Sequence, residues 1–145
     1  MSDPRANGHN PQHGLPGSNT LTLSYLHRRL QSVGHAVDGI GVLMRTQPNA
    51  RIHFVATILV TAAGLWFSIA AAEWALIAFA VAGVWTAEAF NTSIEFLVDL
   101  ASPERHPLAG RAKDVAAAGV LVSTCGAVAI GLLVFGPRLL TLLKG

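Results

Sequence analysis

The sequence is short of charge. Only 12% of its 145 residues are Asp, Glu, Lys or Arg, about half the share typical of soluble domains, whereas 52% are hydrophobic. The formal net charge of +2 is too small to indicate a nucleic-acid partner. Cysteine occurs once, as Cys125, which excludes a disulfide framework and a cysteine-based metal site. These shortages indicate a small membrane domain with little room for a soluble one.

Three stretches carry almost no charge, namely residues 54–72, 74–97 and 115–136. Each is close to the roughly 20 residues that a helix needs to cross a bilayer. We therefore expect an all-α membrane protein with three transmembrane helices, at about residues 51–71, 73–99 and 111–136. The link between the first two is so short that these helices should be antiparallel neighbours.

The residues before the first apolar stretch divide into two parts. Residues 1–20 are rich in Pro and Gly, which predicts a disordered tail. In residues 24–46 apolar side chains recur every three or four positions, which predicts an amphipathic helix on the cytoplasmic interface or packed on the base of the bundle. Pro48 marks a break after it. Residues 21–145 should then form one membrane domain.

Basic residues indicate the orientation. They cluster before the first predicted span and between the second and third, whereas Glu73 alone separates the first two spans. The positive-inside rule then places the N-terminus and the second connection in the cytoplasm and the C-terminus outside.

A polar stripe lies at one end of the second predicted span. On a helix, Glu88, Asn91, Glu95 and Asp99 fall within an arc of about 80°. Ionisable groups at membrane depth are costly and usually functional. A second polar set opens the third predicted span: Arg111, Lys113 and Asp114.

Together the two sets favour a site for a metal-bound nucleotide. Carboxylate and amide oxygens suit Mg²⁺, and Lys and Arg beside a helix start suit phosphate. A carboxylate in a low-dielectric setting can serve as a general base, and Glu88 lies deepest. Because the glycine-rich phosphate loop and the protein-kinase motifs are both missing, neither common kinase framework is used. An acceptor reaching such a site through the membrane would be a lipid alcohol, while an ion or proton carrier and a structural role stay open.

Three segments carry a resemblance: ARIH (50–53), EAFNTSIEFLVD (88–99) and HPLAGRAKDVAAAGVL (106–121). Over about residues 28–137 the chain resembles the bacterial integral-membrane diacylglycerol kinase and undecaprenol kinase family. The resemblance implies a homotrimer in the inner membrane, with sites between protomers that use ATP and Mg²⁺ to phosphorylate a lipid hydroxyl. The pattern NTxIExxxDL and the RIH segment favour undecaprenol, giving undecaprenyl phosphate, with diacylglycerol, giving phosphatidic acid, as the alternative.

The resemblance also implies roles for single residues. Glu88 matches the proton-abstracting residue at the lipid, and Glu95 matches a metal ligand. The positions that match nucleotide-binding ones are Arg28, Asn91, Glu95, Asp99, Glu104, His106, Lys113 and Asp114.

Three positions leave alternatives open. Gln47 stands where the family usually has a glutamate that shares the metal, and a glutamine can give an oxygen but no charge. This departure leaves open weaker metal binding or a non-catalytic membrane subunit. Arg51 could bind the lipid substrate or only anchor the first span, and Asp99 could meet the nucleotide or pair with Arg111.

Overall fold

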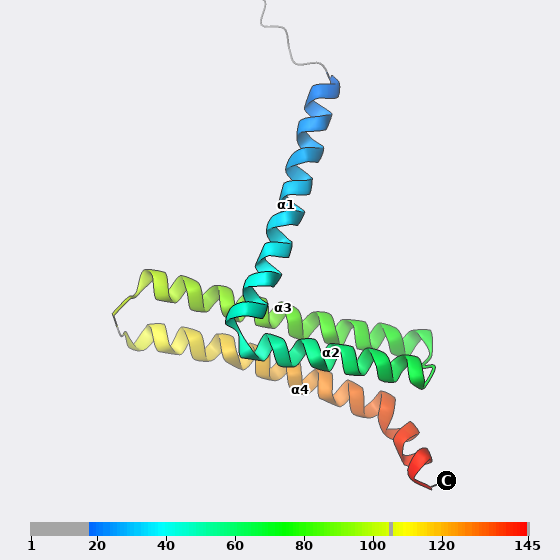
Figure 1. The fold of residues 1–145 in the computed structure, drawn as a ribbon. Coiled ribbons are helices and arrows are strands. Elements are labelled where there is room, and N and C mark those ends of the chain that lie inside the picture. The colour runs from blue at the N-terminus through cyan, green and yellow to red at the C-terminus, as the bar shows by residue number, and fades with distance from the viewer. Residues whose placement is uncertain (1–17, 105, 145) are drawn as a thin grey trace, which may run out of the picture. The chain divides into compact units, whose positions relative to one another are not determined.

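All regular secondary structure in the described residues is helical. The computed structural model describes residues 18–104 and 106–144, and its elements are α1 (Ser18–Thr46), α2 (Pro48–Trp66), α3 (Ala71–Ala101) and α4 (Pro107–Lys144) (Figure 1). The predicted all-α class is therefore confirmed. The predicted tail lies mostly outside the described residues, and α1 already begins at Ser18.

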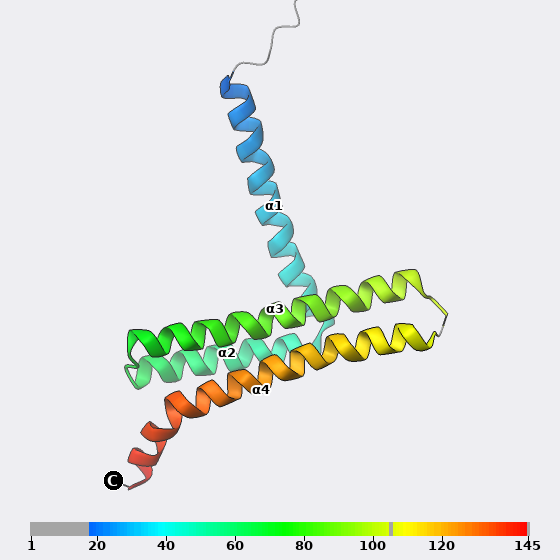
Figure 2. The same cartoon turned by 180° about the vertical axis from the view of Figure 1, so that it is seen from behind.

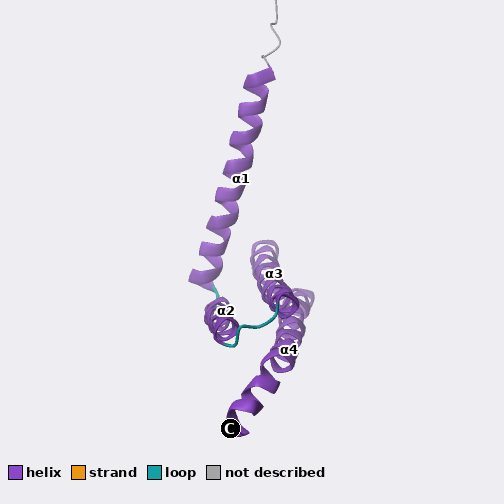
Figure 3. Ribbon diagram, turned by 90° about the vertical axis from the view of Figure 1, so that its right-hand side faces the viewer, coloured by secondary structure: helices purple, strands orange, loops and turns teal. Residues whose placement is uncertain are grey.

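Two compact units divide the chain, residues 1–39 and residues 40–145. In the second unit, α2, α3 and α4 run side by side, with α3 packed against both of the others (Figures 2 and 3). Short links join them, so successive helices are antiparallel. Pro48 occupies the first turn of α2, where its missing N–H is not needed, so the predicted break falls between α1 and α2.

The second and third predicted spans begin and end close to or within α3 and α4, whereas the first, 51–71, extends beyond the end of α2 at Trp66. α3 and α4 are long and apolar enough to cross a membrane, by length and composition. Most of the first predicted span falls on α2, which has 19 residues. α4 does not end near residue 136 but continues through Pro137 to Lys144. A proline removes one helical hydrogen bond, and the guanidinium of Arg138 adds another by donating to the Val134 carbonyl. α4 bends in this part of the chain (Figure 1).

The apolar core lies where the end of α2, the start of α3 and the later part of α4 meet. Ile69, Ile77 and Val134 are buried there, and the rings of Phe67 and Phe135 lie 6.2 Å apart. Gly64 allows this approach, because a Cβ at that position would lie 2.7 Å from the ring of Trp74. We call this part of the second unit the far end.

An ion pair also connects α3 to α4 at the far end. Arg138 donates from Nη1 to Oε1 of Glu73 over 2.9 Å and from Nη2 to Oε2 over 2.7 Å. Glu73 Oε2 also accepts the Ala70 N–H at the start of α3, over 2.8 Å. Such two-pronged pairs fix geometry as well as adding energy, so the pair holds the start of α3 to the end of α4.

Candidate active site

Glu88 is the most enclosed polar residue of the described chain. Its side chain lies on α3 with a relative exposure of 0% for the residue. Neither carboxylate oxygen has a hydrogen-bond partner within the described residues. The nearest opposite group is His53 on α2, whose Nε2 lies 3.9 Å from Oε2, too far for a hydrogen bond. A buried acid without a hydrogen-bond partner is unusual in a folded protein, which makes Glu88 a candidate for binding a ligand.

His53 also lines a hollow of about 260 Å³ between α2, α3 and α4, which we call the central hollow. Three buried polar atoms on its walls have no partner in the described part of the chain: His53 Nε2, Asn91 Oδ1 and Thr124 Oγ1. Apolar side chains, among them Val120 and Leu121, form the remaining wall. Unpaired donors and acceptors beside an apolar wall suit the hydroxyl end of an amphiphilic molecule.

Glu95, two turns further along α3, is in the opposite state. Gln47 Nε2 donates to its Oε2 over 3.0 Å, and Asn91 Nδ2 donates to its Oε1 over 2.9 Å. Each carboxylate oxygen therefore has an amide donor. Through Asn91 this network is continuous with the central hollow.

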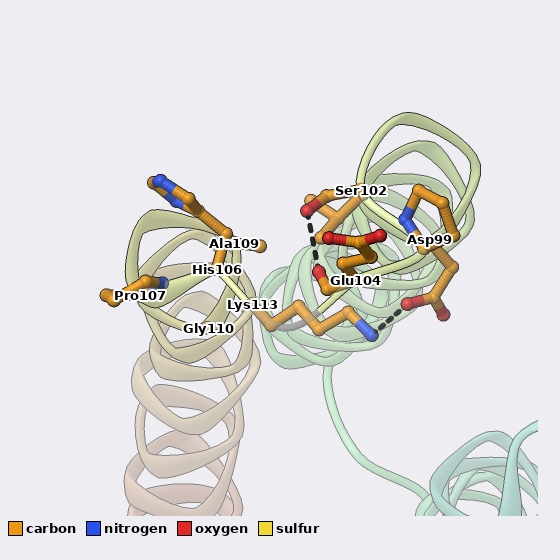
Figure 4. A pocket seen from close by; sticks show the side chains of 10 residues that line it. Asp99, Ser102, Glu104, His106, Pro107, Ala109, Gly110 and Lys113 are labelled. Atoms are coloured by element: carbon orange, nitrogen blue, oxygen red, sulfur yellow. Dashed lines mark hydrogen bonds and ion pairs between the residues drawn. The ribbon is translucent and has the colours of Figure 1, made fainter.

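A second hollow, of about 500 Å³, lies where α3 ends and α4 begins, and we call it the loop hollow. Figure 4 shows Lys113 reaching from α4 to Asp99 on α3, with Glu104 and His106 on the connecting loop. The Ser102 hydroxyl donates to the Glu104 carbonyl over 2.9 Å, and His106 Nδ1 accepts the Leu108 N–H over 3.2 Å. The volume is in the range of ligand pockets. Its lining combines the ammonium of Lys113, which suits a phosphate group, with the acidic side chains of Asp99 and Glu104.

Asp99 pairs with Lys113 in this structure, and not with Arg111. Asp114 is exposed on α4 and does not belong to the residues lining the loop hollow. Arg28 is exposed on α1, within the first unit. The nucleotide roles of Asp114 and Arg28 stay predictions.

Arg51 has a structural role that the sequence did not indicate. Its Nε donates to the Met44 carbonyl over 2.9 Å and its Nη2 to the Arg45 carbonyl over 2.8 Å. These carbonyls belong to the last turn of α1 and have no helical donor of their own. Arg51 therefore caps the end of α1, while both predicted roles, binding lipid and anchoring the first span, stay predictions.

Comparison with known proteins shows to which family the chain belongs. The prokaryotic diacylglycerol kinase family matches residues 34–135, more than half of the chain. The chain belongs to this family. An undecaprenol kinase of Bacillus subtilis (strain 168) is 39% identical over 114 residues, which cover 79% of this chain and 93% of the relative. Diacylglycerol kinases of Synechocystis sp. and Escherichia coli (strain K12) are 37% and 31% identical, covering 79% and 70% of this chain and 66% and 83% of their own. The predicted family is confirmed, and the protein is a kinase-family membrane protein.

Glu95 is the place where the described residues of this kinase family member offer oxygen ligands for a divalent cation. Among the residues that the structure describes, no group of three or more His, Cys, Asp or Glu side chains could hold a metal ion. Oxygen donors do gather there, because Asn91 is bonded to Glu95 and has a buried Oδ1 without a partner. Mg²⁺ is usually held by one or two carboxylates together with substrate phosphates. The donor set therefore fits a cation that a nucleotide shares.

Two side chains of the central hollow were missed from the sequence. Neither His53 nor Thr124 is among the candidate site residues that the sequence indicates. The available signal for Thr124 was a hydroxyl inside the uncharged stretch 115–136. Helical Ser and Thr usually bond back to their own backbone, so this signal alone is weak.

Proposed function

We propose that the protein transfers the terminal phosphoryl group of ATP to the hydroxyl of a membrane lipid. The observation that carries this proposal is the buried, unpartnered carboxylate of Glu88, which lies 3.9 Å from His53, a residue that lines the central hollow. Undecaprenol is the preferred acceptor, since the Bacillus subtilis relative is named undecaprenol kinase. Diacylglycerol is the alternative, after the names of the Synechocystis and Escherichia coli relatives.

Each hollow takes one substrate in this proposal. The central hollow is too small for a whole lipid, so it receives the hydroxyl end while the chain lies along apolar helix surfaces. Glu88 accepts the proton of the hydroxyl as the oxygen attacks phosphorus. The loop hollow receives the nucleotide. The phosphates of the nucleotide replace Asp99 as the ion-pair partner of Lys113. Glu104 and His106 hold the nucleobase. For Arg28 and Asp114, a role in binding the nucleotide rests only on the resemblance to the family.

The phosphates run from the loop hollow toward Glu88 along the stripe of α3. With a rise of about 1.5 Å per residue, Asn91 and Asp99 are about 12 Å apart along the helix axis. Glu95 lies between them and, with Asn91, would hold Mg²⁺. The cation supplies neutralisation of phosphate charge when bound. When no cation is bound, the hydrogen bond from Gln47 holds the side chain of Glu95 in place.

The assembly proposed is a homotrimer of three-span protomers with sites between protomers. Large apolar side chains of α4 are exposed in the single chain, among them Val122, Leu132 and Leu133. Within the described residues, nothing lies within 4 Å of a Cβ placed at Gly119 or Gly131, so this face is open to another helix. α2 serves as the first span, α1 lies on the cytoplasmic surface of the inner membrane, and the loop hollow faces the cytoplasm.

Purified protein in lipid vesicles should test the proposal. It is supplied with Mg²⁺ and ATP labelled at the terminal phosphate, together with undecaprenol, diacylglycerol or a lipid without a hydroxyl. We expect label on undecaprenol first, none on the lipid without a hydroxyl, and none with Glu88→Gln. Transfer to neither alcohol, or equal transfer by the variant, would refute the enzyme. Ion flux through vesicles without ATP would instead support the carrier.

A further inference from the structure

Gln47 binds the carboxylate that would hold the metal. It lies at the junction of α1 and α2, as the residue before the first turn of α2, and reaches across to Glu95 on α3. With Asn91 on the other side, the network satisfies both oxygens of Glu95 without any cation. Both hydrogen bonds are partly buried. If they break, water can hydrate the freed amide and carboxylate groups only in part, so breaking them costs free energy.

The direction of this hydrogen bond follows from chemistry. An ionised carboxylate only accepts hydrogen bonds, so Gln47 must present its NH₂ group to Glu95 and turn its oxygen away. A cation at Glu95 would therefore meet amide hydrogens. Gln47 could become a ligand only by rotating its amide and giving up the 3.0 Å hydrogen bond. A glutamate at this position would behave differently, because two carboxylates about 3 Å apart need a proton or a cation between them.

We propose that this protein does not bind its divalent cation in advance, and that the cation enters only together with the nucleotide. The described residues offer one negative charge at this place, from Glu95, and no group of three metal-binding side chains. Nucleotide phosphates provide the missing negative charge and oxygen ligands. Gln47 thus sets the order of binding because, unlike a glutamate, it adds no negative charge beside Glu95. This inference rests on the proposed function.

Retention of Mn²⁺ by the full-length purified protein tests this order without measuring activity. Equilibrium dialysis against Mn²⁺ is done with and without a non-hydrolysable ATP analogue, and protein-bound Mn²⁺ per chain is measured. We expect the unchanged protein to retain Mn²⁺ only with the analogue. Gln47→Glu should retain Mn²⁺ alone, at least about tenfold more tightly, because it adds a charge next to Glu95. Its unfolding temperature should fall without Mn²⁺ and recover with it.

Two variants separate charge from other effects. Without nucleotide, Gln47→Ala should retain no Mn²⁺, like the unchanged protein. The reason is that the site has too little negative charge to bind the cation, whereas its size is not limiting. Gln31→Glu makes the same chemical change on α1, in the first unit, and should also leave retention unchanged. Retention of one Mn²⁺ per chain by the unchanged protein without nucleotide would overturn the inference, as would equal retention by Gln47→Glu and the unchanged protein.

The lipid assay on the same preparations keeps the two proposals apart. If label reaches a lipid but Mn²⁺ is retained without nucleotide, the kinase stands and the order of binding falls. If no lipid is labelled but Gln47→Glu, and not the unchanged protein, retains Mn²⁺ without nucleotide, the inference about Gln47 stands and the proposed reaction falls.

Discussion

The far end and the surroundings of the central hollow differ in whether an acidic side chain of α3 has hydrogen-bond partners. At the far end, both oxygens of Glu73 are bonded to Arg138, next to a closed apolar core. Glu88, which neighbours His53 behind the lining of the central hollow, is fully buried, and neither of its oxygens has a hydrogen-bond partner in the described chain. Two glutamates on one helix, α3, thus have very different surroundings.

The difference separates residues that stabilise the fold from residues kept for a ligand. A buried polar group without a partner costs about 1–3 kcal/mol, and more when it is charged. Glu88, His53, Asn91 and Thr124 together therefore lower the stability of the free chain. Functional sites are where proteins tolerate such conflicts. Replacing matched residues at the two places should consequently affect different quantities.

The largest effect is expected from replacing the two glutamates of α3 in turn. Glu88→Gln should lower the rate of phosphoryl transfer by about 10²–10⁴-fold, because an amide cannot accept the proton of the alcohol. It should not lower the unfolding temperature, since a neutral amide is easier to bury than an unpaired acid. Glu73→Gln is the matched control and should show the reverse, with unchanged transfer and a lower unfolding temperature. Measurements of labelled-phosphate transfer and of unfolding in detergent compare both variants, and equal transfer rates would remove the distinction.

Lys113 should give the next largest effect. Lys113→Met removes the ammonium of the loop hollow, and we expect the KM for ATP to rise roughly 10- to 100-fold, the usual effect of losing a charged hydrogen bond. The KM for lipid should stay the same, because the central hollow is intact. Lys144→Met, at the end of the same helix, is the control. Initial rates at varied ATP and varied lipid measure both constants, and a change confined to the lipid KM would contradict the assignment of the two hollows.

A smaller effect is expected at the central hollow from Thr124→Val, which keeps the shape and removes the hydroxyl. If Thr124 binds the acceptor, the KM for lipid should rise about 3- to 10-fold, as for one neutral hydrogen bond. The unfolding temperature should rise, because a buried unpartnered hydroxyl is lost. Thr141→Val, where the hydroxyl is exposed and bonded to the Pro137 carbonyl, should change neither. A raised unfolding temperature with an unchanged lipid KM would show that Thr124 does not contact the acceptor.

Much of the fold and part of the site follow from local patterns. The break at Pro48 is predicted because proline suits a first helical turn, and the stripe from Glu88 to Asp99 because helical spacing fixes a face. Both depend on neighbours along the chain. Spacing could also indicate that the start of α4 lies near the end of α3, because few residues connect them.

The rest depends on contacts between distant parts of the chain. Gln47 meets Glu95 across 48 positions, and Arg138 meets Glu73 across 65, so no local pattern predicts either hydrogen bond. α4 continues through Pro137, past the predicted span of about residues 111–136, because a single lost hydrogen bond does not outweigh the surrounding helical residues. Thr124 shows its lack of a partner only when three helices surround it.

The smallest effect on transfer, and a direct effect on stability, is expected from breaking the far-end pair. Arg138→Met leaves the carboxylate of Glu73 without its two guanidinium donors, so the unfolding temperature should fall while labelled-phosphate transfer by the folded protein is unchanged. Adding Glu73→Gln to Arg138→Met should restore part of the loss, because removing both charges is less costly than leaving one unpaired. Unfolding measurements on both single variants and the double variant form a closed cycle. Additive losses would show that the pair holds no interaction energy, and the contrast with Glu88 would then rest on burial alone.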